Sequence, residues 1–108
     1  MRVNVRTGQT WVLRPTSPPS KGACMLGRST GKRFKESGIS MSKDSSVSTT
    51  HAKITVSGGR LYFADAGSTN GSTVNGINVG KEGAPVELST GMVLGVGETL
   101  LKVTLVSV

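Results

Sequence analysis

Residues 52–64 have the sequence AKITVSGGRLYFA, and this stretch decides the fold class of the chain. Apolar and polar side chains alternate in Ala52–Val56 and again in Arg60–Ala64, with Ser57-Gly58-Gly59 between the two runs. A period of two is typical of a strand with one buried face, and a short glycine-rich link is typical of a hairpin turn. The stretch therefore predicts a β-hairpin.

Short strands of the same kind are predicted on both sides of this hairpin. They are Arg2–Val5, Thr10–Arg14, Ala23–Leu26, Ile39–Ser42, Ser72–Val74, Ile77–Val79, Val86–Leu88, Met92–Leu94 and Leu100–Val106. Pro15–Lys21 contains three prolines, which exclude a central strand there. No segment has the apolar stripe of an amphipathic helix, so we expect almost no helix, and Ser29–Gly38 should be a loop. The pattern predicts an all-β fold, a β-sandwich of about ten to eleven short strands, as one domain over residues 1–108.

Cysteine content and hydropathy point to an intracellular protein. Cys24 is the only cysteine among 108 residues, so no internal disulfide can form. A lone cysteine is typical of a reducing compartment, where it fills space as a small apolar residue. The first residues lack the apolar run of a signal peptide, and no run approaches the ~20 residues that span a bilayer. We therefore expect no membrane association.

The net charge of +7 is concentrated in one third of the chain. Between Lys21 and Lys53 there are seven Lys and Arg residues against two acids, Glu36 and Asp44. A concentrated positive field attracts anionic partners, and nucleic acid, acidic lipid and phosphorylated protein all qualify. A merely solvated basic surface is the alternative interpretation of the charge.

Catalytic and cofactor patterns are weak. The segment GRSTGK, Gly27–Lys32, has three residues between its glycines where a P-loop needs four, and Arg33 stands where Ser or Thr should hold magnesium. His51 is the only histidine, and although Ser48 and Asp65 would complete a triad, there is no nucleophile elbow. A metal site would need more ligands than these. The sequence predicts no enzyme, no metal and no cofactor, and a structural role for His51.

Three separate segments carry hydroxyl, amide, glycine and arginine groups. They are Gly27-Arg28, Val47–His51 and Asp65–Gly76. An arginine fork, hydroxyl donors and the close backbone approach that glycine permits are the groups that hold a phosphate dianion. Any one of the segments alone would be an ordinary turn between strands.

Together these segments resemble the forkhead-associated (FHA) domain, a β-sandwich with its recognition loops at one end. The family pattern is G-R, S-x-x-H, S-x-N-G and V-N-G. It occurs here in that order as Gly27-Arg28, Ser48…His51, Ser68–Gly71 and Val74–Gly76, and the likeness extends from Trp11 to Val106. The resemblance implies a phosphothreonine-dependent interaction module that binds phosphorylated segments of partner proteins.

The resemblance also implies which residues bind the phosphopeptide. Arg28 and Ser48 should contact the phosphate directly, and Thr69 should add a hydroxyl from the facing loop. Asn70 should hold the peptide backbone beside the phosphothreonine. Thr49 belongs to the same binding set, although many family members have a basic residue or Asn at its position.

Other residues are expected to support the site. Gly27 and Gly71 should allow backbone shapes that a side chain would hinder, and His51 should brace the loops. The side chains that could replace the charge missing at Thr49 are those of Lys32, Arg33, Lys35 and Lys43, provided that their loop folds toward the site.

Two other kinds of partner stay open at this stage. The chain has only four aromatic residues, Trp11, Phe34, Tyr62 and Phe63, and no visible stacking platform, which argues against nucleic acid. A sandwich face that binds protein independently of phosphate is the second alternative. We expect a monomer, and family membership would favour a nuclear over a cytoplasmic location, although no targeting signal is present.

Overall fold

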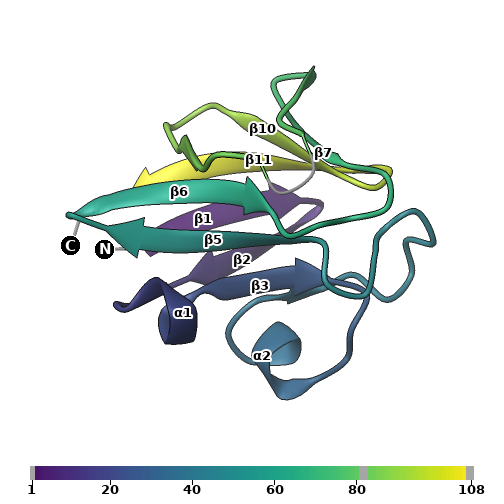
Figure 1. The fold of residues 1–108 in the computed structure, drawn as a ribbon, viewed down its shortest axis with the longest axis horizontal. Coiled ribbons are helices and arrows are strands. Elements are labelled where there is room, and N and C mark those ends of the chain that lie inside the picture. Colours follow the sequence, from purple (N-terminus) through teal and green to yellow (C-terminus); the bar gives the residue numbers. More distant parts are fainter. Residues whose placement is uncertain (1, 81–82, 107–108) are drawn as a thin grey trace.

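The computed structural model describes residues 2–80 and 83–106, which form two stacked sheets (Figure 1). The first sheet has the strand order β2 (Gln9–Leu13), β1 (Arg2–Thr7), β11 (Thr99–Val106), β10 (Val93–Val96), β7 (Ser72–Val74) and β8 (Ile77–Asn78). The second has the order β4 (Ile39–Ser40), β3 (Cys24–Gly27), β5 (Ala52–Ser57), β6 (Arg60–Asp65) and β9 (Val86–Glu87). The predicted all-β sandwich is confirmed. The outer limits of the predicted domain, residues 1, 107 and 108, lie outside the described residues.

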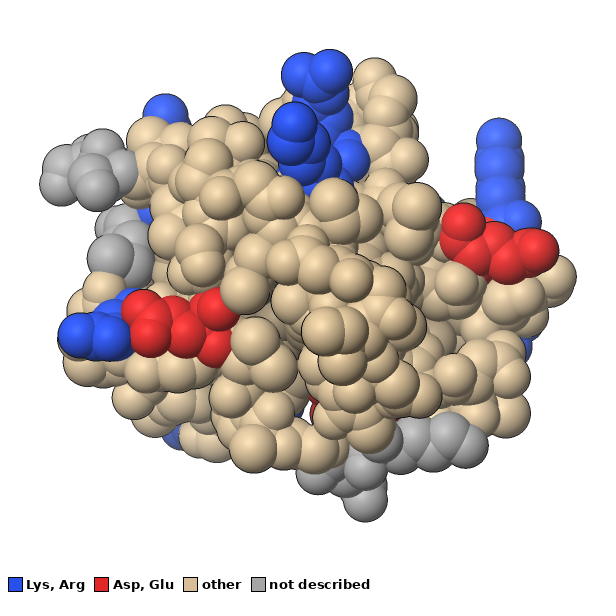
Figure 2. All heavy atoms as spheres, turned by 90° about the horizontal axis from the view of Figure 1, so that it is seen from above, with Lys and Arg blue, Asp and Glu red and all other residues tan. Residues whose placement is uncertain are grey.

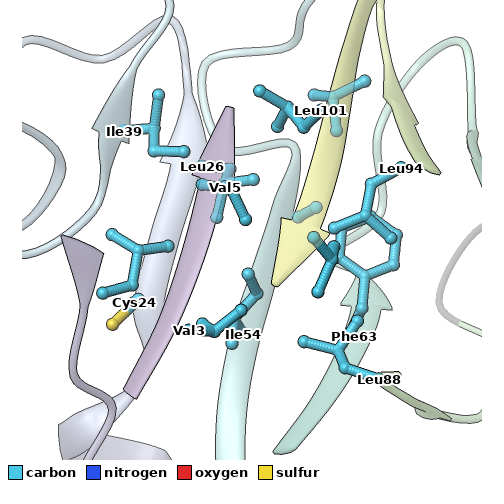
Figure 3. Packing of buried hydrophobic residues seen from close by; sticks show 14 of the residues in the cluster. Val3, Val5, Cys24, Leu26, Ile39, Ile54, Phe63, Leu88, Leu94 and Leu101 are labelled. Carbon is cyan, nitrogen blue, oxygen red and sulfur yellow. The ribbon is translucent and has the colours of Figure 1, made fainter. Parts of the chain in front are cut away.

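The core lies between the sheets and is built from the alternation that the sequence shows. In β5 and β6, Ile54 pairs with Phe63, and both side chains are fully buried. In the opposite sheet Val5 pairs with Val103, and their side chains are also fully buried (Figure 3 shows the surrounding cluster). Cys24 belongs to the same cluster, and burial raises the pKa of its thiol. The cysteine is thus an apolar filler, as its solitary occurrence predicted.

Two single helical turns interrupt the strands. They are α1 (Pro19–Gly22) and α2 (Lys32–Lys35). The prediction of a loop over Ser29–Gly38 is therefore wrong for residues Lys32–Lys35, which form a helical turn. A turn of four residues needs no amphipathic stripe, because a few local bonds hold it, among them those from the N–H groups of Phe34 and Lys35 to the carbonyl oxygen of Gly31.

The turn between β10 and β11 also differs from its predicted place. The sequence predicted a strand over Met92–Leu94 that ends before Gly95. Instead Gly95 pairs with both Leu100 and Thr73, so β10 continues to Val96. Gly97 has φ +63°, which places the reversal at this residue and the one after it.

Burial of Phe63 between the sheets gives a direct test of this core. The substitution Phe63→Ala should lower the free energy of unfolding by about 3–5 kcal/mol, because it removes a large apolar side chain and leaves a cavity. Urea denaturation measures the change. Val12→Ala on edge strand β2 is the matched control, because the Val12 side chain is 43% exposed. Equal losses for the two variants would contradict the packing.

Candidate functional site

Strand direction brings the predicted site residues to one end of the sandwich. Arg28 follows β3, Ser48 precedes β5 and Thr69 follows β6. Because β5 runs antiparallel to both β3 and β6, the start of β5 lies beside the ends of its two neighbours. Figure 1 shows these loops together at its right-hand end, away from the two termini.

Arg28 is anchored to the loop that carries Ser48. The Arg28 backbone N–H donates to the carbonyl oxygen of Ser48 at 3.0 Å, and the side-chain Nε–H donates to the carbonyl oxygen of Val47. The residue is exposed at the surface. The Nε–H bond fixes the guanidinium beside the loop and leaves its two terminal NH₂ groups as donors for an anion.

Ser48 joins this loop to the β6–β7 loop. Its Oγ accepts the backbone N–H of Thr69 at 2.9 Å, so its own hydroxyl hydrogen can be donated elsewhere. A second link runs beside it, where Nδ2 of Asn70 donates to the carbonyl oxygen of Ser46 at 3.0 Å. The Asn70 amide nitrogen is therefore used in a contact within the protein, and Oδ1 is left as a hydrogen-bond acceptor.

His51 connects the same two loops from underneath, where it is fully buried. Its Nδ1 accepts the backbone N–H of Ser48 at 3.0 Å, and its Nε2 lies 2.9 Å from the carbonyl oxygen of Gly71. A nitrogen that accepts an N–H carries no hydrogen, so Nε2 is the protonated nitrogen of a neutral ring. His51 thus contacts the Ser48 backbone rather than its hydroxyl, which is not the arrangement of a catalytic triad.

Asp65 holds the β6–β7 loop in shape. Its Oδ1 accepts the N–H groups of Gly67 and Ser68, both at 2.8 Å, and its Oδ2 accepts the hydroxyls of Ser68 at 2.5 Å and Ser72 at 2.6 Å. Ser68 Oγ in turn accepts the N–H of Gly71 at 2.9 Å. Burial raises the pKa of the Asp65 carboxyl, but the hydrogen bonds outweigh burial, and the pKa is lowered.

From the sequence, Asp65 was a possible triad member and the first residue of the Asp65–Gly76 segment, but its role in holding the loop was not predicted. The signal was present, because an Asp followed by Ala-Gly-Ser is typical of a side chain that accepts backbone N–H groups two and three residues ahead. Ser72 was also given no role, yet it is buried and donates to the same carboxylate.

Gly27 and Gly71 are required for two different steric reasons. A Cβ at Gly27 would overlap the carbonyl oxygen of Thr49, so the two backbones can approach only without a side chain there. Gly71 has φ +79°, the left-handed region that glycine adopts without strain. Thr49 itself is exposed, and its carbonyl oxygen accepts the N–H of Ser29 at 3.1 Å.

The basic β3–β4 loop does not place all its charges at the site. The Arg33 guanidinium donates to the carbonyl oxygen of Ala23 at 3.3 Å, just before the start of β3 and therefore at the other end of that strand from Arg28. Lys32 and Lys35 are exposed on α2, and Lys43 lines a separate groove. Arg33 therefore does not replace the basic residue that is missing at Thr49.

Comparison with known proteins identifies the family. A family model described as the FHA domain matches residues 24–97, which is more than half of the chain. The chain belongs to the FHA domain family. Its two-sheet architecture agrees with this membership, and so does the position of Arg28, Ser48 and Thr69 at one end of the sandwich.

Solved FHA domains have the same architecture. One, from a structural and functional study of phosphothreonine-dependent FHA domain interactions, is 26% identical, with a TM-score of 0.75 and full coverage of both chains. The FHA domain of an Arabidopsis thaliana hypothetical protein is 27% identical, with a TM-score of 0.78, covering 98% of this chain and 86% of its own. The FHA domain of CT664 from Chlamydia trachomatis is 22% identical, with a TM-score of 0.75 and coverage of 99% and 100%.

No curated protein matches the chain. Within residues 2–80 and 83–106, no helix is long and apolar enough to cross a bilayer, and no group of three or more His, Cys, Asp or Glu side chains could hold a metal ion.

The hydrogen bonds to Asp65 predict how stability depends on pH. The carboxyl titrates near pH 3.9 in the unfolded chain and lower in the folded protein, so its stabilising effect is complete above that value. As pH falls from about 4 through the folded pKa, this contribution is lost. Urea denaturation across this range should show a weaker pH dependence for Asp65→Asn than for the unmodified chain. Identical slopes would contradict the assignment.

Proposed function

We propose that this chain is a phosphothreonine-dependent interaction module whose FHA domain spans residues 1–108 and binds phosphorylated segments of partner proteins. The observation that supports this proposal best is a pair of hydrogen bonds at one edge of the sandwich. They join Ser48 to Arg28 and to Thr69, which come from three segments that are remote in the sequence. The role requires no chemistry and no cofactor from the chain itself.

The phosphate lies between the two linked loops in this proposal. It brings about −1.5 to −2 charges and three acceptor oxygens at neutral pH. The terminal groups of Arg28 and the hydroxyls of Ser48 and Thr69 are its donors. Arg28 is already held through Nε, so less side-chain freedom is lost on binding.

Magnitudes agree with a reversible interaction. A hydrogen bond to a charged group contributes roughly 1.5–3 kcal/mol net. Two or three of them, with contacts to the peptide backbone, reach about −8 kcal/mol, which corresponds to micromolar affinity. Asn70 Oδ1 supplies one backbone contact, and the exposed Thr49 hydroxyl can supply another.

One face of the domain lacks the continuous basic surface that is typical of a nucleic-acid binder. On the face shown in Figure 2, Lys and Arg side chains form separate small groups with neutral residues between them, and two of these groups lie beside acidic side chains. Proteins that bind the phosphate backbone of nucleic acids typically have a continuous basic stripe on their surface. Binding that falls steeply with salt and ignores threonine phosphorylation would favour nucleic acid instead.

A monomeric state and a nuclear location stay predictions. The FHA fold also occurs in CT664 of Chlamydia trachomatis, so family membership does not by itself indicate a nucleus. Sedimentation of the purified chain tests the monomer.

Replacing Arg28 tests the phosphate site. Arg28→Ala should weaken binding of a phosphothreonine peptide, selected from a degenerate library, by about 2–5 kcal/mol, the range for removing one partner of a desolvated charge pair. Isothermal titration measures it. Arg60→Ala is the control of equal charge, because Arg60 lies at the β5–β6 turn, at the opposite end of the sandwich, in an exposed pair with Glu87. Unchanged affinity in Arg28→Ala would refute the site.

Replacing Ser48 separates phosphate recognition from a phosphate-independent interface. Ser48→Ala removes a donor to the phosphate and the acceptor of the Thr69 N–H, so affinity for the phosphorylated peptide should fall at least tenfold, or about 1.4 kcal/mol. The unphosphorylated peptide should bind neither protein. An interface on a sandwich face would bind both peptides and would be indifferent to the substitution.

A further inference from the structure

A groove of about 630 Å³ opens next to the proposed phosphate site. Its walls come from three places: the β1–β2 hairpin including Trp11, residues 40–45, and Glu98 with Thr99 after β10. The wall residue Ser45 is three positions before Ser48 in the chain, and three extended residues span at most about 11 Å. A peptide segment a few residues long can therefore reach from the phosphate site into the groove.

The groove holds its shape through Asp44. The Asp44 carboxylate accepts the N–H groups of Ser46 at 3.0 Å and Glu98 at 2.9 Å, and the Thr99 hydroxyl at 2.7 Å. Burial raises the pKa of this carboxyl, but the hydrogen bonds outweigh burial, and the pKa is lowered. A carboxylate that is ionised at neutral pH thus ties the β4–β5 loop to the β10–β11 turn and adds a negative charge to the wall.

Lys43, Glu98 and Trp11 also line the groove. Within the described part of the chain, neither Lys43 nor Glu98 forms an ion pair within 4.0 Å. Trp11 is half-buried, packs against the core and still lines the groove. With two acids and one base, the groove is net negative in a chain of charge +7.

We infer that the groove binds an arginine side chain of the phosphorylated partner, carried on the segment that flanks the phosphothreonine. A planar guanidinium can stack on the Trp11 ring while it donates two parallel hydrogen bonds to the Glu98 carboxylate. Lysine lacks the plane and the fork, so arginine should be preferred over lysine. The inference rests on the proposed function, because the phosphate site holds the segment in place.

A peptide library with a fixed phosphothreonine and otherwise degenerate positions tests the inference. Arginine, lysine, glutamate or alanine is fixed in turn at each flanking position, and binding of the purified chain is measured. We expect arginine to raise binding over alanine by about three- to tenfold at one or two positions, the range for an exposed ion pair with a stacking contact. No gain with arginine, or a gain with glutamate, would overturn the inference and leave phosphothreonine binding intact.

The variant Glu98→Gln assigns the preference to the groove. It removes the charge and keeps the backbone N–H that Asp44 accepts. The arginine advantage should fall to within about twofold of alanine, since the ion pair is lost, while the alanine peptide binds as before. Glu87→Gln, in the pair with Arg60 at the other end of the sandwich, is the matched control. An advantage that survives Glu98→Gln overturns the inference. If the unmodified chain binds no phosphothreonine peptide at all, the proposed function is refuted, and the inference with it.

Discussion

The buried imidazole of His51 is the contact on which the rest of the binding end depends. It accepts the Ser48 N–H and donates to the Gly71 carbonyl, so one neutral ring fixes the distance between two loops that leave different strands. A buried polar side chain is tolerated only when its hydrogen-bonding groups are paired, and both ring nitrogens are. The Ser48–Thr69 and Asn70–Ser46 bonds above the ring then close the gap at the surface.

A second polar layer supports the first. The Asp65 carboxylate accepts three hydrogen bonds from the loop that follows it and one from Ser72, the first residue of β7. Ser68 in turn accepts the N–H of Gly71, whose carbonyl oxygen is bonded to His51. These hydrogen bonds within the chain restrain both loops. Binding then loses little conformational freedom, which allows a small number of phosphate contacts to give useful affinity.

The sequence predicts the sandwich well and the site in part. Alternation of apolar and polar residues is a local property of the sequence. The hairpin over residues 52–64 and most of the other strands could therefore be predicted from it. The pairing of Gly95 with both Leu100 and Thr73 is not local, which is why the extra residues of β10 were missed. The family motif indicated Arg28, Ser48 and Thr69 but not the direction of Arg33, whose guanidinium turns toward Ala23. The groove beside Trp11 could not be predicted, because it exists only where three distant segments meet.

We propose that one edge of this domain recognises a phosphorylated threonine. An NMR titration of the ¹⁵N-labelled chain with O-phosphothreonine, and in parallel with threonine, tests it most directly. The backbone amide signals of Arg28, Ser48 and Thr69 should shift with O-phosphothreonine and should not shift with threonine. Shifts confined to a sandwich face, or equal shifts with both compounds, would contradict it.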